Sequence, residues 1–423
     1  MKSNLPVNAG RIAETIDALA AITEPGRPWT RRAFSPMFLE GRAYLTQRFA
    51  DAGLETRIDA GGNLIGRRAG RVAGHGTIML GSHSDTVPEG GRFDGIAGVA
   101  AALEVAQALA DQDIQLNHDL EVVDFLAEEV SIFGVSCIGS RSMAGVLPPD
   151  WLSRTNGDLS LEQGIADAGG SPAGIASAKR QDIAAFLELH IEQGPVLEAG
   201  KIDVGIVTAI SGITRIEIIV EGRADHAGTT PMGRRKDALV AASRLVVAIE
   251  KMAAERAKGA GHFTATVGEF SMEPNAANVV PSRARLLIDA RAELRPDMDV
   301  FVADVRELCE WMAEATGVTI ATPKGLSDNA PTPADPMLLG VLTQACETSG
   351  ASHRRMASGA GHDTAWMARV TKSAMIFIAC REGRSHSADE WAETDDIALG
   401  TAVLLHAVIQ LDKDLQISIQ ETA

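Results

Sequence analysis

The sequence has few cysteines, no cluster of basic residues and no long apolar run, and each shortage excludes a class of protein. Its four cysteines lie far apart without a CxxC pair, and Glu14 and Asp17 stand where a signal peptide needs an apolar core. Both observations predict a protein of the reducing cytoplasm. The longest apolar run, 95–103, ends at Glu104, well short of the roughly 18 residues that suggest a membrane span, so we expect no membrane segment.

Positive charge and two common catalytic signatures are also scarce. The chain has 39 Lys+Arg against 56 Asp+Glu, a formal net charge of -17, and it lacks the clustered cations that neutralise phosphates. This balance argues against a nucleic-acid-binding surface and favours solubility. The segment "GSHSDTVPEGG" lacks the Lys-Ser/Thr of a phosphate loop, and no G-x-S-x-G elbow offers a serine nucleophile. Nucleotide binding and serine hydrolysis are therefore not expected.

The sequence does contain the pattern of an α/β enzyme with two parts. Its 423 residues exceed the usual single core, and 45% hydrophobic with 22% charged residues is ordinary for a globular enzyme. Short β-rich runs alternate with helical patterns, which predicts a sheet covered by helices. The clearest of these runs are "TIMLGSHS", "LEVVDFLAEE", "AFLELHIE" and "SAMIFIA", and the clearest helices are "GIAGVAAALEVAQALAD" and "DDIALGTAVLLHAVIQL".

A second module is predicted at residues 211–329. Strand and helix patterns follow one another there in the order βαββαβ, which is typical of a ferredoxin-like fold. The stretch "GLSDNAPTPADP" at its end is typical of a linker because it is rich in Pro and Asp. The first domain is then discontinuous, with residues 1–210 and 330–423.

Polar side chains follow three of the apolar strands. His83 comes after "IML", Glu128 and Glu129 after "VVDFLA", and His190 after "AFLEL". Ligands bind beyond the carboxyl ends of strands in such sheets, so these groups are expected to meet. The expected set supplies three imidazoles and two carboxylates, suits zinc, manganese, cobalt or nickel, and could bridge two ions through one carboxylate; its members are His83, Asp94, Glu129, His190 and His386.

Neighbouring acids have predicted roles around these ligands. His83 and Asp85 point the same way in an extended chain, so Asp85 can accept the free ring N–H of His83 and orient it. Of the adjacent pair Glu128 and Glu129, one can face a metal while the other takes a proton from water. Metals lower the pKa of bound water toward ~7, and a positioned base adds roughly 10²–10⁴-fold, so hydrolysis of a carbonyl-type bond follows. A lone histidine in a strand, such as His190, is more often structural than a ligand. The five candidate ligands together favour a metal site.

Seven motifs resemble, in this order, the N-carbamoyl-L-amino-acid hydrolase, allantoate amidohydrolase and β-ureidopropionase family of bimetal amidohydrolases, which is related to aminoacylases and metallo-exopeptidases. They are "GSHSDTVPEGGRFDGIAGV", "AEEVSIFGVSCIGSR", "ELHIEQGPVLE", "GRADHAGTTPMGRRKDAL", "PNAANVVPSRARLLIDAR", "SGAGHDTAWMA" and "REGRSHSADE". The resemblance runs from "TRRAFSP" to about Glu393. It implies a phosphorylase/hydrolase-like metallo-exopeptidase catalytic domain with an inserted ferredoxin-like lid and dimerisation domain.

The resemblance also implies roles in a site with two divalent ions, Zn, Mn, Co or Ni. His83 and His190 are implied to bind the first ion, and Glu129 and His386 the second. Asp94 is implied to bridge the two ions, and Glu128 to act as the general base. His226 is implied to reach the active site of the other subunit of a homodimer and to hold the carbonyl oxygen as it gains charge. Stabilisation of this kind is commonly worth about 3–4 kcal/mol.

The implied substrate contacts come from both domains. Asn278 and Arg291 would clamp a carboxylate, which suits the planar, bidentate fork of arginine. Gln193 would contact the ureido group, and Gly359 and Gly361 would let the backbone approach the ligand. The implied reaction is hydrolysis of the ureido C–N bond of an N-carbamoyl-L-amino acid or a close relative such as allantoate, releasing ammonia and CO2. A metallo-exopeptidase or aminoacylase acting on peptides or N-acyl amino acids stays open as the alternative, and so does a silent binding protein.

Two stretches depart from the family pattern. After the paired acids the family usually has Gly-Ser-Arg-Phe, whereas this chain has Val130, Ser131, Ile132 and Phe133. Before and after the last histidine ligand it has Ala379-Cys380 and Ser387-Ala388 in place of the usual Pro-Ser and proline. A buried, inert thiol is the favoured interpretation of Cys380. These changes leave every ligand in place and leave the substrate open.

Overall fold

The computed structural model describes residues 6–422, with side chains described for 6–415, as two compact units. The first comprises the chain up to Thr208, Ala334–Met356 and the chain from His362 onward; the second comprises Ala209–Pro333 and Ala357–Gly361. The division predicted from the sequence placed residues 357–361 in the first domain. This segment groups with the second unit because the Ser211 amide donates to the Ser358 carbonyl (2.9 Å) and Arg291 Nη1 donates to the Gly359 carbonyl (2.7 Å).

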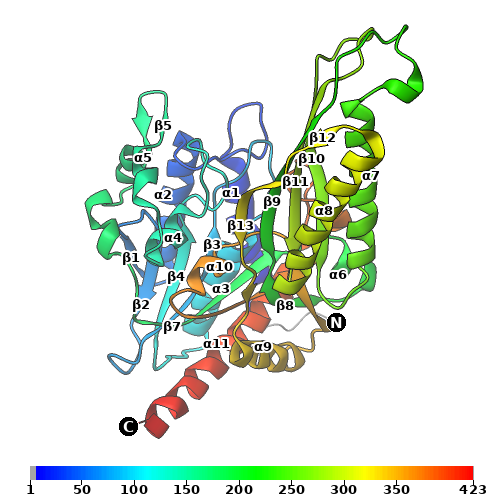
Figure 1. Ribbon diagram of the computed structural model, residues 1–423. Helices are drawn as coiled ribbons and strands as arrows, with labels where there is room; N and C mark the ends of the chain where they lie inside the picture. Colours follow the sequence, from blue (N-terminus) through cyan, green and yellow to red (C-terminus); the bar gives the residue numbers. More distant parts are fainter. Residues whose placement is uncertain (1–5, 423) are drawn as a thin grey trace. The chain divides into compact units, whose positions relative to one another are not determined.

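A mixed sheet forms the framework of the first unit (Figure 1). Its order is β1-β2-β4-β3-β7-β16-β8-β14, and β15 also pairs with β8. The neighbouring strands β4, β3, β7 and β16 run parallel. The pairs β1–β2, β2–β4, β16–β8 and β8–β14 are antiparallel. The bounds are β1 Glu55–Ile58, β2 Leu64–Arg68, β3 Thr77–His83, β4 Asp119–Phe125, β7 Ile183–Ile191, β8 Val204–Ile210, β14 Thr332–Pro333, β15 His353–Ser358 and β16 Lys372–Ile378.

Helices cover both faces of this sheet. Ile78 and Leu80 of β3 face one core, which α1, α3, α9 and α11 complete, whereas Met79 faces a second core with Met143 of α4 and Met367 of α10. Every residue of β3 is buried, as in a parallel strand covered on both faces. The helices are α1 Ala9–Ala21, α2 Pro36–Asp51, α3 Ile96–Asp111, α4 Ile138–Met143, α5 Leu161–Asp167, α6 Val196–Gly200, α9 Pro336–Thr348, α10 Thr364–Met367 and α11 Thr394–Thr422.

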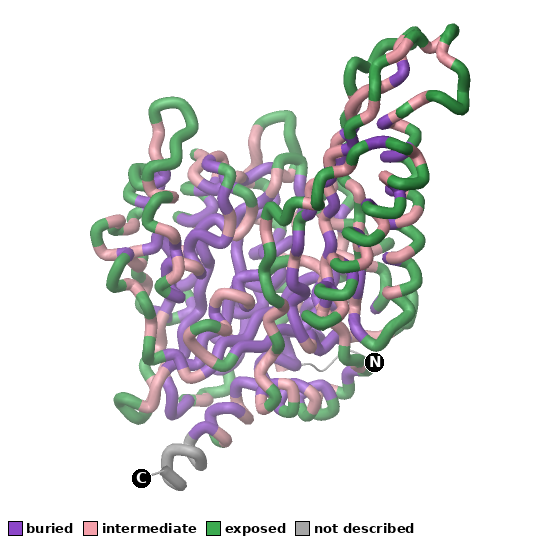
Figure 2. Tube along the Cα trace, in the orientation of Figure 1, coloured by how far each residue is buried: buried purple, intermediate pink, exposed green. Residues whose placement is uncertain are grey.

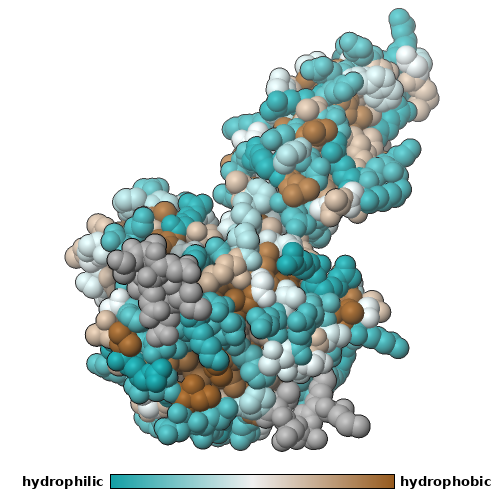
Figure 3. All heavy atoms as spheres, turned by 90° about the horizontal axis from the view of Figure 1, so that it is seen from below, coloured by the Kyte–Doolittle hydropathy of each residue, from teal (hydrophilic) through white to brown (hydrophobic). Residues whose placement is uncertain are grey.

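Helix α11 is the one described helix that is long and apolar enough, over Thr394–Leu415, to cross a membrane by length and composition alone. Most of this stretch is buried against α3 and α9, and Figure 2 shows the buried residues gathered at the middle of the unit. Its apolar character is thus explained by packing in the core. The face drawn in Figure 3 carries mainly hydrophilic residues with apolar residues scattered among them.

The second unit is an antiparallel sheet with two helices packed against it (Figure 1). Its elements are β9 Gly212–Glu221, α7 Ala238–Arg256, β10 Phe263–Glu273, β11 Arg283–Ala292, α8 Arg295–Thr316, β12 Thr319–Ile320 and β13 Lys324–Asn329. The strand order β10-β11-β9-β12 and the predicted βαββαβ sequence are those of a ferredoxin-like module. Residues of β11 alternate between half-buried and buried, which leaves one face of the sheet for the helices.

Part of the predicted linker is a strand. Residues 324–329 form β13 and pair antiparallel with β9, from Lys324 opposite Glu217 to Asn329 opposite Ile213. A register shift between Gly325 and Ser327 interrupts the ladder. The sequence shows no alternating pattern here, because the strand is mostly exposed and its one large apolar residue, Leu326, lies at the register shift.

Candidate metal centre and active site

The carboxyl ends of the parallel strands bring the candidate ligands to one place. β3 ends at His83, β7 carries His190 next to its end, and Glu129 and His386 follow β4 and β16. Asp94 lies in the loop between β3 and α3. Because these strands are neighbours in the sheet, the groups that follow them meet at the same edge. All five residues predicted as ligands lie together there.

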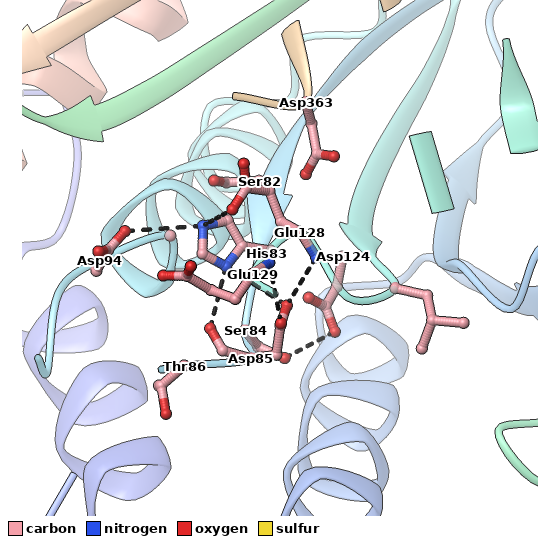
Figure 4. A network of polar contacts seen from close by, with 12 residues as sticks. Ser82, His83, Ser84, Asp85, Thr86, Asp94, Asp124, Glu128, Glu129 and Asp363 are labelled. Atoms are coloured by element: carbon pink, nitrogen blue, oxygen red, sulfur yellow. Dashed lines mark hydrogen bonds and ion pairs between the residues drawn. The ribbon is translucent and has the colours of Figure 1, made fainter. Parts of the chain in front are cut away.

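Asp94 contacts three of the other four candidate ligands, and Figure 4 shows it beside His83. Its Oδ1 is 3.1 Å from Nε2 of His190 and 3.8 Å from Nε2 of His83, and its Oδ2 is 3.1 Å from Nε2 of His386. The same nitrogen of His386 is 3.2 Å from Oε1 of Glu129. The potential ligand atoms therefore form two groups, His83 with Asp94 and His190, and Asp94 with Glu129 and His386. One carboxylate shared by two groups is the arrangement needed to bridge two cations.

Two histidine rings turn Nε2 toward Asp94. Nδ1 of His83 lies 3.0 Å from the Asp85 carbonyl oxygen, and Nδ1 of His190 lies 2.9 Å from the Ile191 carbonyl oxygen. A carbonyl oxygen only accepts, so each Nδ1 carries a proton, and Nε2 of each neutral ring is the atom that would bind a cation. In this structure Nε2 of His190 accepts the amide of Gly95 at 3.1 Å. With two carboxylates opposite, this donor set fits a divalent metal of the zinc or manganese type.

Burial and charge act in opposite directions on the pKa values of this group. Burial lowers the pKa of His83 and of His190, but neighbouring carboxylates, first Asp85 for His83 and Asp94 for His190, outweigh it and raise both. Hydrogen bonds, first to Asp94, raise the pKa of His386 to about 10. Burial alone would raise the pKa of Asp94, yet its histidine neighbours lower it well below the ordinary value. Cations are therefore favoured here, and a metal ion would compete with these protons.

Asp85 anchors the loop that carries the paired acids. The residue is 1% exposed, its Oδ1 accepts the amide of Glu128 and its Oδ2 accepts the amide of Glu129, both at 3.2 Å. The sequence predicted that its carboxylate orients His83, but Oδ1 is 3.5 Å from Nδ1 of His83, and the Asp85 carbonyl makes the shorter contact. Asp85 thus ties the end of β3 to the loop after β4 (Figure 4).

Glu128 lies beside the two groups of ligands without belonging to either. Its Oε2 is 3.7 Å from Nε2 of His83, and the Cys137 thiol is 3.6 Å from its Oε1. Burial, and then the neighbouring carboxylates, raise the pKa of Glu128 well above its ordinary value, although His83 acts the other way. A carboxyl group with a raised pKa can take up a proton and return it, which is the behaviour of a general base and acid.

Gln193 lies at the same site in a strained conformation. Its φ of 57° is in the left-handed region, and its Nε2 donates to Asp94 Oδ2 (2.9 Å) or Ser385 Oγ (3.2 Å). Its Oε1 is buried and has no hydrogen-bond partner among the described residues. A buried acceptor without a donor costs free energy, so a ligand N–H would be stabilising there.

In the second unit, His226 and Asn278 lie next to each other. An isolated bridge pairs His226 with Val279, and the Ala227 amide donates to the Asn278 carbonyl at 3.0 Å. Nδ1 of His226 accepts the amides of Gly228 (3.0 Å) and Thr229 (3.2 Å). The neutral ring therefore carries its proton on Nε2, on an exposed side chain that can donate a hydrogen bond.

Arg291 and the predicted glycine loop also meet in the second unit. Nε of Arg291 donates to Asp289 (2.9 Å), and Nη1 donates to the Gly359 carbonyl. A Cβ on Gly359 would lie 3.0 Å from Nε2 of His262, whereas a Cβ on Gly361 would meet nothing within 4 Å. The absence of a side chain at Gly359 thus leaves space for the His262 ring.

Sequence reasoning missed two residues of the site, Ser385 and Glu390. Ser385 Oγ lies 3.0 Å from Asp94 Oδ2, and the Glu390 carboxylate accepts the amides of Phe93 and Asp94. The available signal was their position in "REGRSHSADE", where they flank His386. A third group, Glu188, His190 and His362, also has ligand atoms close together, but Ser82 and Thr364 already donate to the Glu188 carboxylate.

The positions that depart from the family pattern fall in different environments. Val130 is 60% exposed beside Glu129, whereas Ile132 packs with Phe133 in an apolar cluster. Cys380 is buried in the main core, and burial raises the pKa of its thiol to about 11. Neither group of potential metal ligands includes it, which agrees with an inert thiol.

Comparison with known proteins places this site in a family. Residues 79–410 match peptidase family M20/M25/M40. The chain is 35% identical to an N-carbamoyl-L-amino-acid amidohydrolase of Paenarthrobacter aurescens (96% of this chain, 98% of that protein) and 35% identical to an allantoate amidohydrolase of Escherichia coli (95% and 97%). It is 34% identical to a ureidoglycolate hydrolase of Oryza sativa subsp. japonica (96% and 85%).

A solved structure extends the comparison to the fold. A hydantoinase/carbamoylase family amidase of Burkholderia multivorans superposes with a TM-score of 0.89 at 35% identity, covering 96% of this chain and 98% of that one. The α/β fold with a separate antiparallel sheet is thus the one predicted. The chain belongs to the metal-dependent peptidase family M20/M25/M40 and, within it, to the hydantoinase/carbamoylase amidohydrolases, which act on C–N bonds.

Proposed function

We propose that the protein hydrolyses the ureido C–N bond of an N-carbamoyl-L-amino acid or a close relative such as allantoate or ureidoglycolate. For an N-carbamoyl amino acid, the substrate and one water give the amino acid, carbon dioxide and ammonia. The observation that carries the proposal is the pair of ligand groups sharing Asp94, with Glu128 beside them. The names of the relatives support the substrate class.

Two divalent ions are proposed as cofactors, Zn, Mn, Co or Ni. His83 and His190 would hold one, Glu129 and His386 the other, and Asp94 would bridge them. When bound, such ions polarise a carbonyl group and make water acidic enough to attack it near neutral pH. Glu128 would take the proton of that water and later return it to the leaving nitrogen. The free Oε1 of Gln193 would accept an N–H of the ureido group.

The second unit would hold the remainder of the substrate. The side chain of Arg291 is 33% exposed, and it would pair with the substrate carboxylate together with Asn278. His226, with its proton on Nε2, would donate to the carbonyl oxygen as it gains charge.

We further propose a homodimer in which His226 acts in the partner's active site. The second unit has an open sheet edge, since β10 pairs only with β11 among the described strands. Phe270 on that strand is 41% exposed, and Val247 on α7 is 67% exposed. An unpaired edge beside exposed apolar residues is a ready template for a second copy.

Mixing two inactive variants tests the homodimer. Denaturing and refolding His226→Ala together with Glu128→Gln should restore about one quarter of wild-type turnover, because half of the dimers are mixed and each has one complete site. No recovery in a mixture that light scattering shows to contain dimers would contradict action across the interface.

The substrate class is tested with chelator-stripped protein reloaded with Mn²⁺, Co²⁺, Ni²⁺ or Zn²⁺. Ammonia release is measured with N-carbamoyl amino acids, carbamoyl-β-alanine, allantoate and ureidoglycolate, and free amine release with dipeptides and N-acetyl amino acids. Metal-dependent ammonia from a ureido compound is the expected result. Amine from peptides or acyl amino acids alone would refute it and would favour an exopeptidase or aminoacylase.

A further inference from the structure

Glu390 joins the two loops that carry the ligands of one half of the site. Its Oε1 accepts the amides of Phe93 (2.8 Å) and Asp94 (3.0 Å), and its Oε2 accepts the hydroxyl of Ser385 (2.8 Å), the residue before His386. Glu390 is 1% exposed. A single buried carboxylate therefore connects the loop after β3 to the loop after β16, nearly 300 residues away in the chain.

The surroundings are shaped around this carboxylate. A Cβ on Gly91 would lie 1.8 Å from Oε1 of Glu390, so only glycine leaves room for it. The φ angle of Gly91 is not positive, so its backbone conformation does not require glycine. Glycine is required there only because a side chain would collide with Glu390. The Ser385 hydroxyl also lies within reach of Asp94 Oδ2, and the Gln193 amide donates to the Ser385 oxygen.

The two halves of the site differ in what supports them. His83 and His190 belong to strands, and each is 1% exposed. His386 lies in an irregular loop with φ of 52°, and 51% of its side chain is exposed. Strand pairing holds the first two histidines in place, whereas the third depends on whatever fixes its loop.

We propose that Glu390 is a positioning residue that acts mainly on the site of Asp94, Glu129 and His386. The other site shares Asp94 but keeps His83 and His190, which strands hold in place. The inference rests on the two-ion site of the proposed function. Glu390 holds Asp94 by its backbone and His386 through Ser385, so its loss would let the second pair of ligands separate. Outer partners of this kind typically change metal affinity 10–100-fold.

The test is a titration of the metal-stripped, full-length protein with Co²⁺ alone. Calorimetry and visible absorption measure the binding. Wild type should bind two ions in two steps. Glu390→Ala should weaken the second step about 10–100-fold and leave the first within about threefold. Gly91→Ala should do the same because its methyl group displaces the carboxylate, and it carries the test if Glu390→Ala does not fold. Glu390→Gln, which keeps an acceptor for both amides, should lie between them and wild type.

The control is Asp389→Ala, which removes an exposed carboxylate from the same turn and should bind both ions as wild type does. Equal weakening of both steps, no weakening, or a single ion per wild-type subunit would overturn the inference. Wild type that binds two Co²⁺ ions but hydrolyses no ureido compound would refute the proposed substrate class and leave the role of Glu390 standing.

Discussion

Substitution of Asp85 tests directly whether this residue anchors the loop that carries Glu128 and Glu129. Its two carboxylate oxygens accept the amides of Glu128 and Glu129, one each, in a buried place. Asp85→Asn keeps one acceptor and turns an NH2 group toward the other amide. Leaving one buried amide unsatisfied costs about 1–3 kcal/mol, so we expect that loss in the stability of the metal-free first unit. Asp85→Ala leaves both amides without an acceptor and should cost about twice as much.

Four of the five tryptophans lie in the first unit, and Trp311 lies in the second. Guanidinium unfolding of a Trp311→Phe background, followed by fluorescence, therefore reports on the first unit. The matched control is Asp51→Asn, an exposed acid at the end of α2, which should change stability by less than about 0.5 kcal/mol. In the reloaded protein, Co²⁺ affinity should fall about 10–100-fold for Asp85→Asn, because the loop carrying Glu129 is no longer held. Unchanged unfolding and unchanged Co²⁺ affinity would refute the anchoring role.

Three other predictions follow from the structure. Glu128→Gln should keep its metals and lose roughly 10²–10⁴-fold in turnover, and wild-type turnover would rule out Glu128 as the base. Asp412→Ala should destabilise the first unit by about 3–5 kcal/mol, because Asp412 accepts the amides of Asn117 and His118 and contacts the His118 ring in a buried place. Burial raises the pKa of Asp412, but its hydrogen bonds, first that to His118, lower it overall. The stabilisation by Asp412 is therefore complete above about pH 4 and is lost as the pH falls through the lower pKa of the folded state. Unfolding of wild type and Asp412→Ala between pH 7 and 3 should show the stability difference between them shrinking. All four cysteines are free and buried, so Ellman's reagent should label none in the native protein and four in denaturant, and fast native labelling of Cys380 would contradict its burial.

The sequence alone determined the α/β alternation, the βαββαβ module and the identity of the candidate ligands. Each of these leaves a local signal: the spacing of apolar residues reveals strands and helices, and His83 or His190 is recognisable because it directly follows an apolar run. The exposed strand β13 leaves no such signal, and its residues 325–329 were predicted as the start of a linker.

Only the tertiary structure decided how the site is held. Asp85 and Glu128 are 43 residues apart, and Glu390 and Phe93 are 297 apart, and each pair is joined by one carboxylate accepting a backbone amide. Any residue except proline can donate a backbone amide, so the sequence of the donor segment carries no pattern that predicts such a bond. The chemistry of this protein is therefore visible in its side chains, whereas the support of that chemistry depends on segments that meet only when the chain is folded.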